Sequence, residues 1–158
     1  MYDTLLAWKS EAKKDCLLVK GARQVGKTYL IREFAKNEYE SFVEINFHEQ
    51  KSLKVIFDGD KTAEEIYKRL TANIPGVKLI PGKTLIFFDE IQNVNEFEKV
   101  VNSLRASLNV SIFMTGSNSK LLSNELSTVL SGRYVSFNIN PLNYREYIEL
   151  TGQDAYDE

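Results

Sequence analysis

The chain has 158 residues, 43% of them apolar and 27% charged, and its net charge is −2 at pH 7. This length and composition are ordinary for one globular domain, and no apolar stretch reaches the roughly 20 residues that a membrane span needs. The first ten residues also lack the apolar segment of a signal peptide, so we expect a cytoplasmic protein without a membrane contact.

The only cysteine, Cys16, lies in an apolar stretch, which favours a small core side chain over a reactive thiol. The only histidine, His48, has no second His or Cys at metal-ligand spacing, so no zinc site is expected. Residues 1–36 hold eight Lys/Arg against four Asp/Glu, but part of this positive charge belongs to a glycine-rich loop. Nucleic-acid binding therefore has no independent support in the composition.

The glycine-rich loop, GARQVGKT at residues 21–28, joins the first predicted strand to the first predicted helix. The apolar residues 16–19 form the strand, and residues 29–36 place Leu30, Ile31 and Phe34 at helical spacing. The order Gly, four residues, Gly, Lys and Thr between a strand and a helix is that of a phosphate-binding loop. It predicts that the protein handles a nucleoside triphosphate.

The residue types of this loop fit a bound triphosphate and its metal. Gly21 and Gly26 allow backbone N–H groups to turn inward around a phosphate, and the N-terminus of the following helix favours the same anion. Lys27 can reach the β- and γ-phosphates, and Thr28 can offer its hydroxyl to Mg²⁺. The predicted nucleotide-binding residues are Gly21, Ala22, Arg23, Gln24, Val25, Gly26, Lys27, Thr28 and Tyr29.

Two acidic residues follow the third predicted strand. Residues 42–47 form the second predicted strand, residues 62–65 are typical of a capping box that opens an amphipathic helix, and residues 84–88 are apolar as in a central parallel strand. Asp89, directly after that strand, can hold Mg²⁺ through water, and Glu90 can position and deprotonate an attacking water. A solvated turn is the alternative, but the upstream loop favours a hydrolytic site.

The remaining pattern completes an α/β fold. Residues 95–98 predict a second capping box, followed by an apolar stripe along residues 97–108. Residues 110–115 and 134–139 are predicted strands, and residues 119–130 and 143–150 are predicted helices. This alternation favours a five-stranded parallel sheet with helices on both faces, a three-layer α/β/α sandwich.

Four segments carry a family resemblance: GARQVGKT, LIFFDEIQ, MTGSNS and LSGRYVSFNINPLNYREY. In this order and spacing they resemble the AAA+ ATPases of bacteria and archaea that carry an appended C-terminal domain of poorly defined role. The first two segments are shared with many P-loop ATPases, whereas DEIQ and the last segment are more specific to this group. The resemblance implies a P-loop NTPase fold of the AAA+ type, with ATP and Mg²⁺ as cofactors.

The resemblance also implies roles for single polar residues. Asn46 resembles the residue that contacts the catalytic glutamate, although an asparagine there can also cap the strand. Among Thr115, Ser117 and Asn118, Asn118 is our choice for the residue that senses the γ-phosphate, with a helix N-cap as the alternative. Arg133 resembles the arginine that such enzymes insert into a neighbour's active site, and pairing with a nearby carboxylate is the alternative. The predicted catalytic set is Glu90, Lys27, Asn118, Arg133 and Asn46, and the predicted metal ligands are Thr28 and Asp89.

AAA+ proteins normally continue into a helical lid, and residues 153–158 are too few to build one. We therefore expect residues 1–158 to be one AAA+ nucleotide-binding core and a fragment without the lid and the C-terminal domain. The alternative is that another chain supplies these elements. The resemblance further implies a homo-oligomer in which Arg133 acts in trans, and a missing region that recruits a further partner.

Three functions remain for such a domain. Mg²⁺-dependent ATP hydrolysis is the first expectation, because Glu90 stands beside Asp89 after a buried strand. The second is a nucleotide-gated switch or assembly module with negligible turnover on its own, since Arg133 would complete a neighbour's site. The third, a small-molecule kinase, uses the same loop, but no acceptor-binding pattern occurs in the sequence.

Overall fold

The computed structural model describes residues 2–10, 16–20, 27–116 and 134–138, and the description below concerns these parts of the chain. In chain order the elements are α1 (Tyr2–Ser10), β1 (Cys16–Lys20), α2 (Lys27–Glu38), β2 (Ser41–Asn46), the 3₁₀ helix η1 (Lys51–Phe57), α3 (Ala63–Asn73), β3 (Thr84–Asp89), the 3₁₀ helix η2 (Ile91–Asn93), α4 (Phe97–Leu108), β4 (Ser111–Thr115) and β5 (Tyr134–Asn138). None of the described helices combines the length and the apolar content needed to cross a bilayer.

The five strands form one parallel sheet in the order β2-β3-β4-β1-β5. This confirms the predicted α/β fold with a five-stranded parallel sheet. β4 lies between β1 and β3, so the strand that leads into the glycine-rich loop and the strand that ends in Asp89 are not neighbours. Because parallel strands run in the same direction, their carboxyl ends meet at one edge of the sheet.

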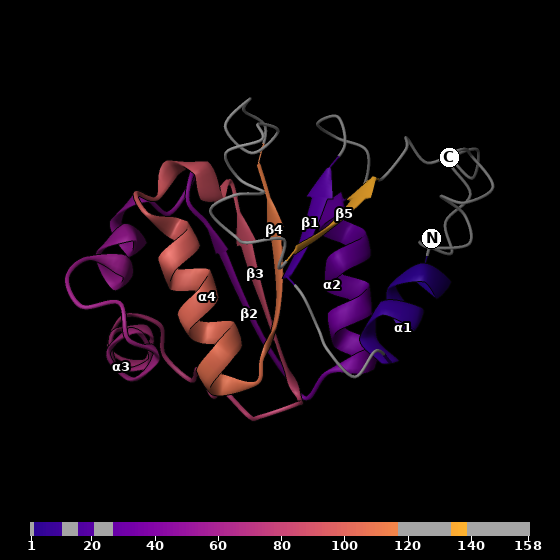
Figure 1. Cartoon of the computed structure of the whole chain (residues 1–158), viewed down its shortest axis with the longest axis horizontal. Coiled ribbons are helices and arrows are strands. Elements are labelled where there is room, and N and C mark those ends of the chain that lie inside the picture. The colour runs from indigo at the N-terminus through magenta and orange to yellow at the C-terminus, as the bar shows by residue number, and fades with distance from the viewer. Residues whose placement is uncertain (1, 11–15, 21–26, 117–133, 139–158) are drawn as a thin grey trace, which may run out of the picture.

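Each face of the sheet is covered by its own helices. Successive side chains of a strand point to opposite faces, and on β1 Cys16 and Leu18 belong to one apolar cluster while Leu17 and Val19 belong to the other. The first cluster includes residues of α3 and α4, and the second includes residues of α1 and α2. Figure 1 shows these two helix pairs on either side of the sheet. The chain therefore has the predicted three layers.

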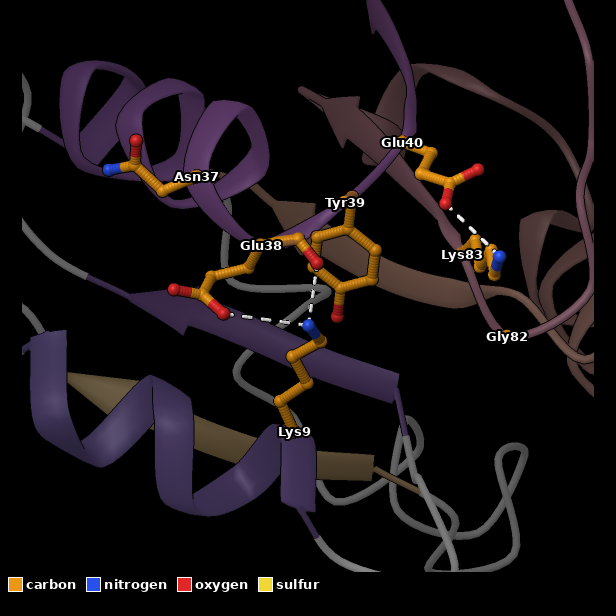
Figure 2. A pocket seen from close by; sticks show the side chains of 7 residues that line it. All are labelled: Lys9, Asn37, Glu38, Tyr39, Glu40, Gly82 and Lys83. Atoms are coloured by element: carbon orange, nitrogen blue, oxygen red, sulfur yellow. Dashed lines mark hydrogen bonds and ion pairs between the residues drawn. The ribbon is translucent and has the colours of Figure 1, made fainter.

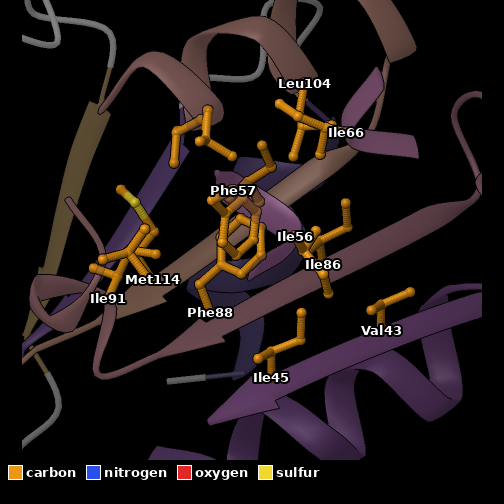
Figure 3. Packing of buried hydrophobic residues seen from close by; sticks show 14 of the residues in the cluster. Val43, Ile45, Ile56, Phe57, Ile66, Ile86, Phe88, Ile91, Leu104 and Met114 are labelled. Atoms are coloured by element: carbon orange, nitrogen blue, oxygen red, sulfur yellow. The ribbon is translucent and has the colours of Figure 1, made fainter. Parts of the chain in front are cut away.

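The first cluster is built around aromatic side chains (Figure 3). The rings of Phe57 and Phe88 meet edge to face, with their centroids 5.5 Å apart, and both side chains are almost completely buried. Ile91, just beyond the end of β3, is also buried in this cluster, near Met114 of β4. The cluster thus extends to the carboxyl edge of the sheet and anchors the chain that leaves β3.

The strongly periodic helices lie close to the predicted ranges. Leu30, Ile31 and Phe34 of α2 are buried as expected, and Cys16 of β1 is a core side chain with 1% exposure. Thr62 is the N-cap of α3, and its side chain accepts a hydrogen bond from the backbone N–H of Glu65. The strand predicted at residues 42–47 begins and ends one residue earlier, at Ser41–Asn46.

The predicted capping box at residues 95–98 is wrong. The N-cap of α4 is Glu96, which has a left-handed backbone with φ 54° and makes no side-chain capping hydrogen bond. A capping residue normally has an extended backbone, so the tight turn from η2 into α4 prevents the capping geometry. The sequence pattern also missed α1 and both 3₁₀ helices, and the helices predicted at residues 119–130 and 143–150 lie outside the described residues.

Candidate nucleotide and metal site

Polar side chains from three strands and one helix meet at the carboxyl edge of the sheet. Asn46 and Asp89, the last residues of β2 and β3, are paired in register, and Thr115 is the last residue of β4. α2 begins at Lys27, so Thr28 lies in its first turn. A pocket of about 210 Å³ opens here, lined by Thr28, Arg32, Glu44, Asn46, Glu49, Gln50 and Asp89. The parallel topology thus brings together residues that are 61 positions apart in the chain, Thr28 and Asp89.

Two donors hold the carboxylate of Asp89. The side-chain amide of Asn46 donates to its Oδ2 over 3.3 Å, and the hydroxyl of Thr115 donates to its Oδ1. Thr115 is buried, whereas Asp89 is only partly buried and lines the pocket. One carboxylate orientation is therefore stabilised from two neighbouring strands, as is typical of residues that orient a metal ligand.

Asn46 connects Asp89 to the turn after β2. Its Oδ1 accepts from the backbone N–H groups of His48 and Glu49, at 2.9 and 3.2 Å, while its amide nitrogen donates to Asp89. The backbone N–H of Asn46 in turn donates to Gln50 Oε1 over 3.1 Å. Asn46 thus acts on the aspartate of the acidic pair, and it also caps the strand end as the alternative expectation had it.

Glu90 leaves β3 in an unusual backbone conformation, with φ 59° and ψ 46°. Non-glycine residues seldom adopt this left-handed region, which is more frequent at functional sites. The backbone N–H of Glu90 donates to Thr115 Oγ1 over 3.3 Å, and the side-chain amide of Gln92 donates to Glu90 Oε2 over 2.5 Å. The Glu90 carboxylate thus accepts a hydrogen bond from within its own loop.

An ion pair that the sequence analysis did not identify also lines the pocket. Arg32 lies one helical turn after Thr28, and its Nε donates to both carboxylate oxygens of Glu44, at 3.0 and 3.1 Å. The arginine side chain is 59% exposed, so the pair contributes little to stability. The pair becomes visible only when α2 packs beside β2, because neither residue belongs to a recognisable motif.

The donor set at this edge fits a magnesium ion. The Asp89 carboxylate and the Thr28 side chain line one pocket, and Mg²⁺ prefers oxygen ligands of these kinds together with water and phosphate. Among the described residues, no group of three or more His, Cys, Asp and Glu side chains forms a metal cage. In nucleotide sites Mg²⁺ usually keeps several waters and takes one or two carboxylates together with substrate phosphates.

Several predicted site residues lie outside the described parts of the chain. These are Gly21, Ala22, Arg23, Gln24, Val25, Gly26, Ser117, Asn118 and Arg133. Lys27 is described as the first residue of α2, and Tyr29, two positions later, is 38% exposed. Of the three candidates for the phosphate sensor, Thr115 is described, and its hydroxyl is engaged with Asp89 and Glu90.

A second pocket, of about 270 Å³, lies at the opposite, amino edge of the strands (Figure 2). Its lining residues are Lys9, Asn37, Glu38, Tyr39, Glu40, Gly82 and Lys83. Lys9 Nζ donates to the backbone oxygen of Glu38 over 2.5 Å and lies 3.5 Å from the Glu38 carboxylate. Lys83 pairs with Glu40 at 3.1 Å. Both cations of this pocket have acidic partners.

The fold and the site together define a class. A strand that leads through a glycine-rich loop into a helix, and a buried third strand that ends in Asp-Glu at the same edge, are features of P-loop nucleotide-binding domains. Residues 13–148 match the family model described as "AAA domain", and the chain belongs to this family. It is therefore an AAA-type P-loop domain.

Relatives exist in bacteria and archaea. An uncharacterized protein of Haemophilus influenzae is 33% identical over 144 residues, which cover 87% of this chain and 34% of the relative. An uncharacterized protein of Methanocaldococcus jannaschii is 35% identical over 133 residues, which cover 84% of this chain and 28% of the relative. The chain thus spans about a third of the length of these curated relatives.

Solved structures with the same fold include AAA+ proteins. RuvB of Thermotoga maritima aligns with a TM-score of 0.56 and 19% identity, over 94% of this chain and 47% of that one. PCH-2 of C. elegans aligns with a TM-score of 0.56 and 16% identity, over 94% of this chain and 44% of that one. At these identities the similarity is one of fold.

Proposed function

We propose that this domain binds ATP with Mg²⁺ and hydrolyses the bond between its β- and γ-phosphates. The observation that supports the proposal is the pocket at the carboxyl edge of the sheet, which Thr28, Asn46 and Asp89 line together. Thr28 ends the phosphate-binding motif and Asp89 ends the buried strand, so both predicted metal ligands face one space. Membership of the AAA domain family supports the same function.

Each residue has a separate role in the proposal. Lys27 binds the β- and γ-phosphates, while Thr28 and Asp89 hold the metal, Asp89 through water. A bound Mg²⁺ neutralises the charge that develops on the transferred phosphoryl group. Glu90 orients the attacking water and accepts its proton.

The test compares Glu90→Gln and Lys27→Ala in the full-length protein. Glu90→Gln removes the base and keeps the shape, so ATP binding should persist while hydrolysis falls by about 10² to 10⁴. Lys27→Ala should weaken ATP binding itself. Glu64→Gln and Lys51→Ala, which change exposed residues of α3 and η1, are the matched controls. An unchanged hydrolysis rate in Glu90→Gln would remove Glu90 from its role.

The roles of the residues outside the described chain are part of the same proposal. Asn118 would sense the γ-phosphate, and Arg133 would act on the nucleotide of a neighbouring copy. Turnover per molecule should then rise with protein concentration, and Arg133→Ala should abolish this rise. A monomeric enzyme would be favoured if hydrolysis did not depend on protein concentration and did not change in Arg133→Ala.

A nucleotide-gated switch would be favoured if the protein bound ATP with negligible turnover at every concentration. A kinase would be favoured if ATP were consumed only in the presence of an acceptor.

A further inference from the structure

The loop that follows β3 folds back on its own acidic residue. Gln92 lies two residues after Glu90, and its Nε2 donates to Glu90 Oε2 over 2.5 Å. The backbone N–H of Asn93 closes the turn by donating to the carbonyl oxygen of Glu90 over 3.2 Å. An amide N–H is a neutral donor that suits a carboxylate acceptor.

The core fixes the direction of this contact. Ile91, between the two residues, is 1% exposed and packs near Met114 in the first apolar cluster, which includes residues of α3 and α4 (Figure 3). The backbone of Val94 donates to the carbonyl oxygen of Ile91 over 3.0 Å, so the turn on the far side is closed as well. With Ile91 anchored and Glu90 in the left-handed region, the side chain of Gln92 returns to the Glu90 carboxylate.

The arrangement favours an amide over other side chains at position 92. An amide donates to the carboxylate without adding charge, whereas a carboxylate there would repel it. Gln92 Oε1 is buried and has no hydrogen-bond partner in the described part of the chain. A buried acceptor without a partner lowers the free energy of unfolding. A contribution to stability alone therefore does not explain why Gln92 occupies this position.

Asn46 does not occupy this role in the structure. All the hydrogen bonds described for its side chain join Asp89 to the backbone of residues 48 and 49. We propose that Gln92 is the residue that positions the Glu90 carboxylate for water activation, from the same loop and not from the neighbouring strand. The inference rests on the proposed function, because it assigns Gln92 to the residue that acts there as the base.

The test is a double-mutant cycle on the full-length protein. Gln92→Ala and the isosteric Gln92→Glu should each lower kcat for ATP hydrolysis by about 10- to 100-fold, as expected for a misplaced catalytic group. The dissociation constant for ATP should stay within about twofold, because neither variant touches the phosphate-binding residues. In the Glu90→Gln background the same changes at position 92 should have no further effect, because the two residues act as a unit. Asn93→Ala, an exposed change in the same loop, is the control.

A second readout needs neither ATP nor turnover. In protein labelled with ¹⁵N-glutamine, the side-chain amide resonances of Gln92 should move when Glu90→Gln removes the carboxylate acceptor, and they should stay in place in Glu64→Gln. This measurement also covers the case in which the variants at position 92 fold poorly. An amide resonance that ignores Glu90, or equal losses of kcat in both backgrounds, overturns the positioning role alone. Unaltered hydrolysis in Glu90→Gln removes Glu90 from its role as the base, and the positioning role of Gln92 is then overturned with it.

Discussion

Asp89 shows how single residues of this site depend on their neighbours in the sheet. Its two carboxylate oxygens receive different donors, the amide of Asn46 from β2 and the hydroxyl of Thr115 from β4. Thr115 also accepts from the backbone of Glu90, so one buried hydroxyl touches both members of the acidic pair. The orientation of the Asp89 carboxylate and the course of the chain at Glu90 are therefore coupled through Thr115.

Thr115→Val tests this coupling because valine keeps the shape and removes the hydroxyl. Asp89 and the N–H of Glu90 would each lose a partner, so the free energy of unfolding should fall by about 1 to 3 kcal/mol. The affinity for Mg²⁺ in the presence of nucleotide should fall by about 10- to 100-fold, the usual effect of losing an outer-shell partner. Urea unfolding and a Mg²⁺ titration of nucleotide binding measure the two effects.

Thr115→Ser should preserve Mg²⁺ affinity, because it keeps the hydroxyl and loses only a methyl group. Thr71→Val, on the exposed surface of α3, controls for the loss of a threonine hydroxyl elsewhere. Wild-type Mg²⁺ affinity in Thr115→Val would show that the hydroxyl does not hold the metal ligand in place.

Elements with a strong apolar pattern, either periodic or continuous, could be predicted from the sequence. β3 is buried from Thr84 to Phe88, and its apolar run therefore identifies it directly. The first helix, by contrast, has nine residues and an apolar pattern too short to recognise, and it is fixed by burying Leu5 and Trp8 against the sheet. The turn into α4 was mispredicted because tertiary packing sets a left-handed Glu96 where the local sequence favours a cap.

The residues of the candidate site that belong to a sequence motif could be predicted. The contacts that depend on the pairing register of neighbouring strands could not. Asp89 and Glu90 follow from a buried strand that ends in acids. The partner of Asn46 depends on its pairing with Asp89 across two parallel strands, and the role of Thr115 depends on β4 lying beside β3. The contact from Gln92 goes with a positive φ at Glu90. A glutamate seldom adopts a positive φ, so the sequence gives no sign of this conformation.

Tyr39 links the end of α2 to the start of β4. Its burial leads us to expect that the free energy of unfolding depends on pH. Its hydroxyl donates to Ser111 Oγ over 2.9 Å, and burial raises the pKa of the Tyr39 phenol to about 12, against a partly offsetting hydrogen bond with Ser111. An unfolded tyrosine ionises near its ordinary pKa of 10.0. The stability that neutral Tyr39 contributes is therefore complete below pH 10 and should be lost as the pH rises from 10 to 12.

Chemical unfolding between pH 8 and pH 11.5 measures this loss. Tyr39→Phe should cost about 1 kcal/mol at pH 8, because Ser111 loses a hydrogen-bond partner, and its stability should fall less steeply above pH 10. Tyr67→Phe on α3 is the control for removing a phenol hydroxyl. Parallel profiles for Tyr39→Phe and the parent protein would contradict a contribution from Tyr39.

At the scale of the whole molecule, the two edges of the sheet differ in charge chemistry. At the amino edge, Lys9 pairs with Glu38 and Lys83 pairs with Glu40, and the first of these contacts ties α1 to the end of α2. At the carboxyl edge, acidic and polar groups surround an open pocket beside the first turn of α2. A ligand bound there would contact α2, β2 and β3 together.

Binding across these three elements predicts that Mg²⁺ and ATP stabilise the native domain as a unit. A ligand that binds only the native state at 100 times its dissociation constant adds about 2.7 kcal/mol to the free energy of unfolding. For a chain of 158 residues this corresponds to a rise in Tm of roughly 5 to 10 °C. Thermal unfolding with and without EDTA measures the rise in Tm and its metal dependence.

Glu90→Gln should keep the rise in Tm, because it retains ATP binding, and Lys27→Ala should lose most of it. A shift that survives both EDTA and Lys27→Ala would place ATP binding elsewhere on the molecule.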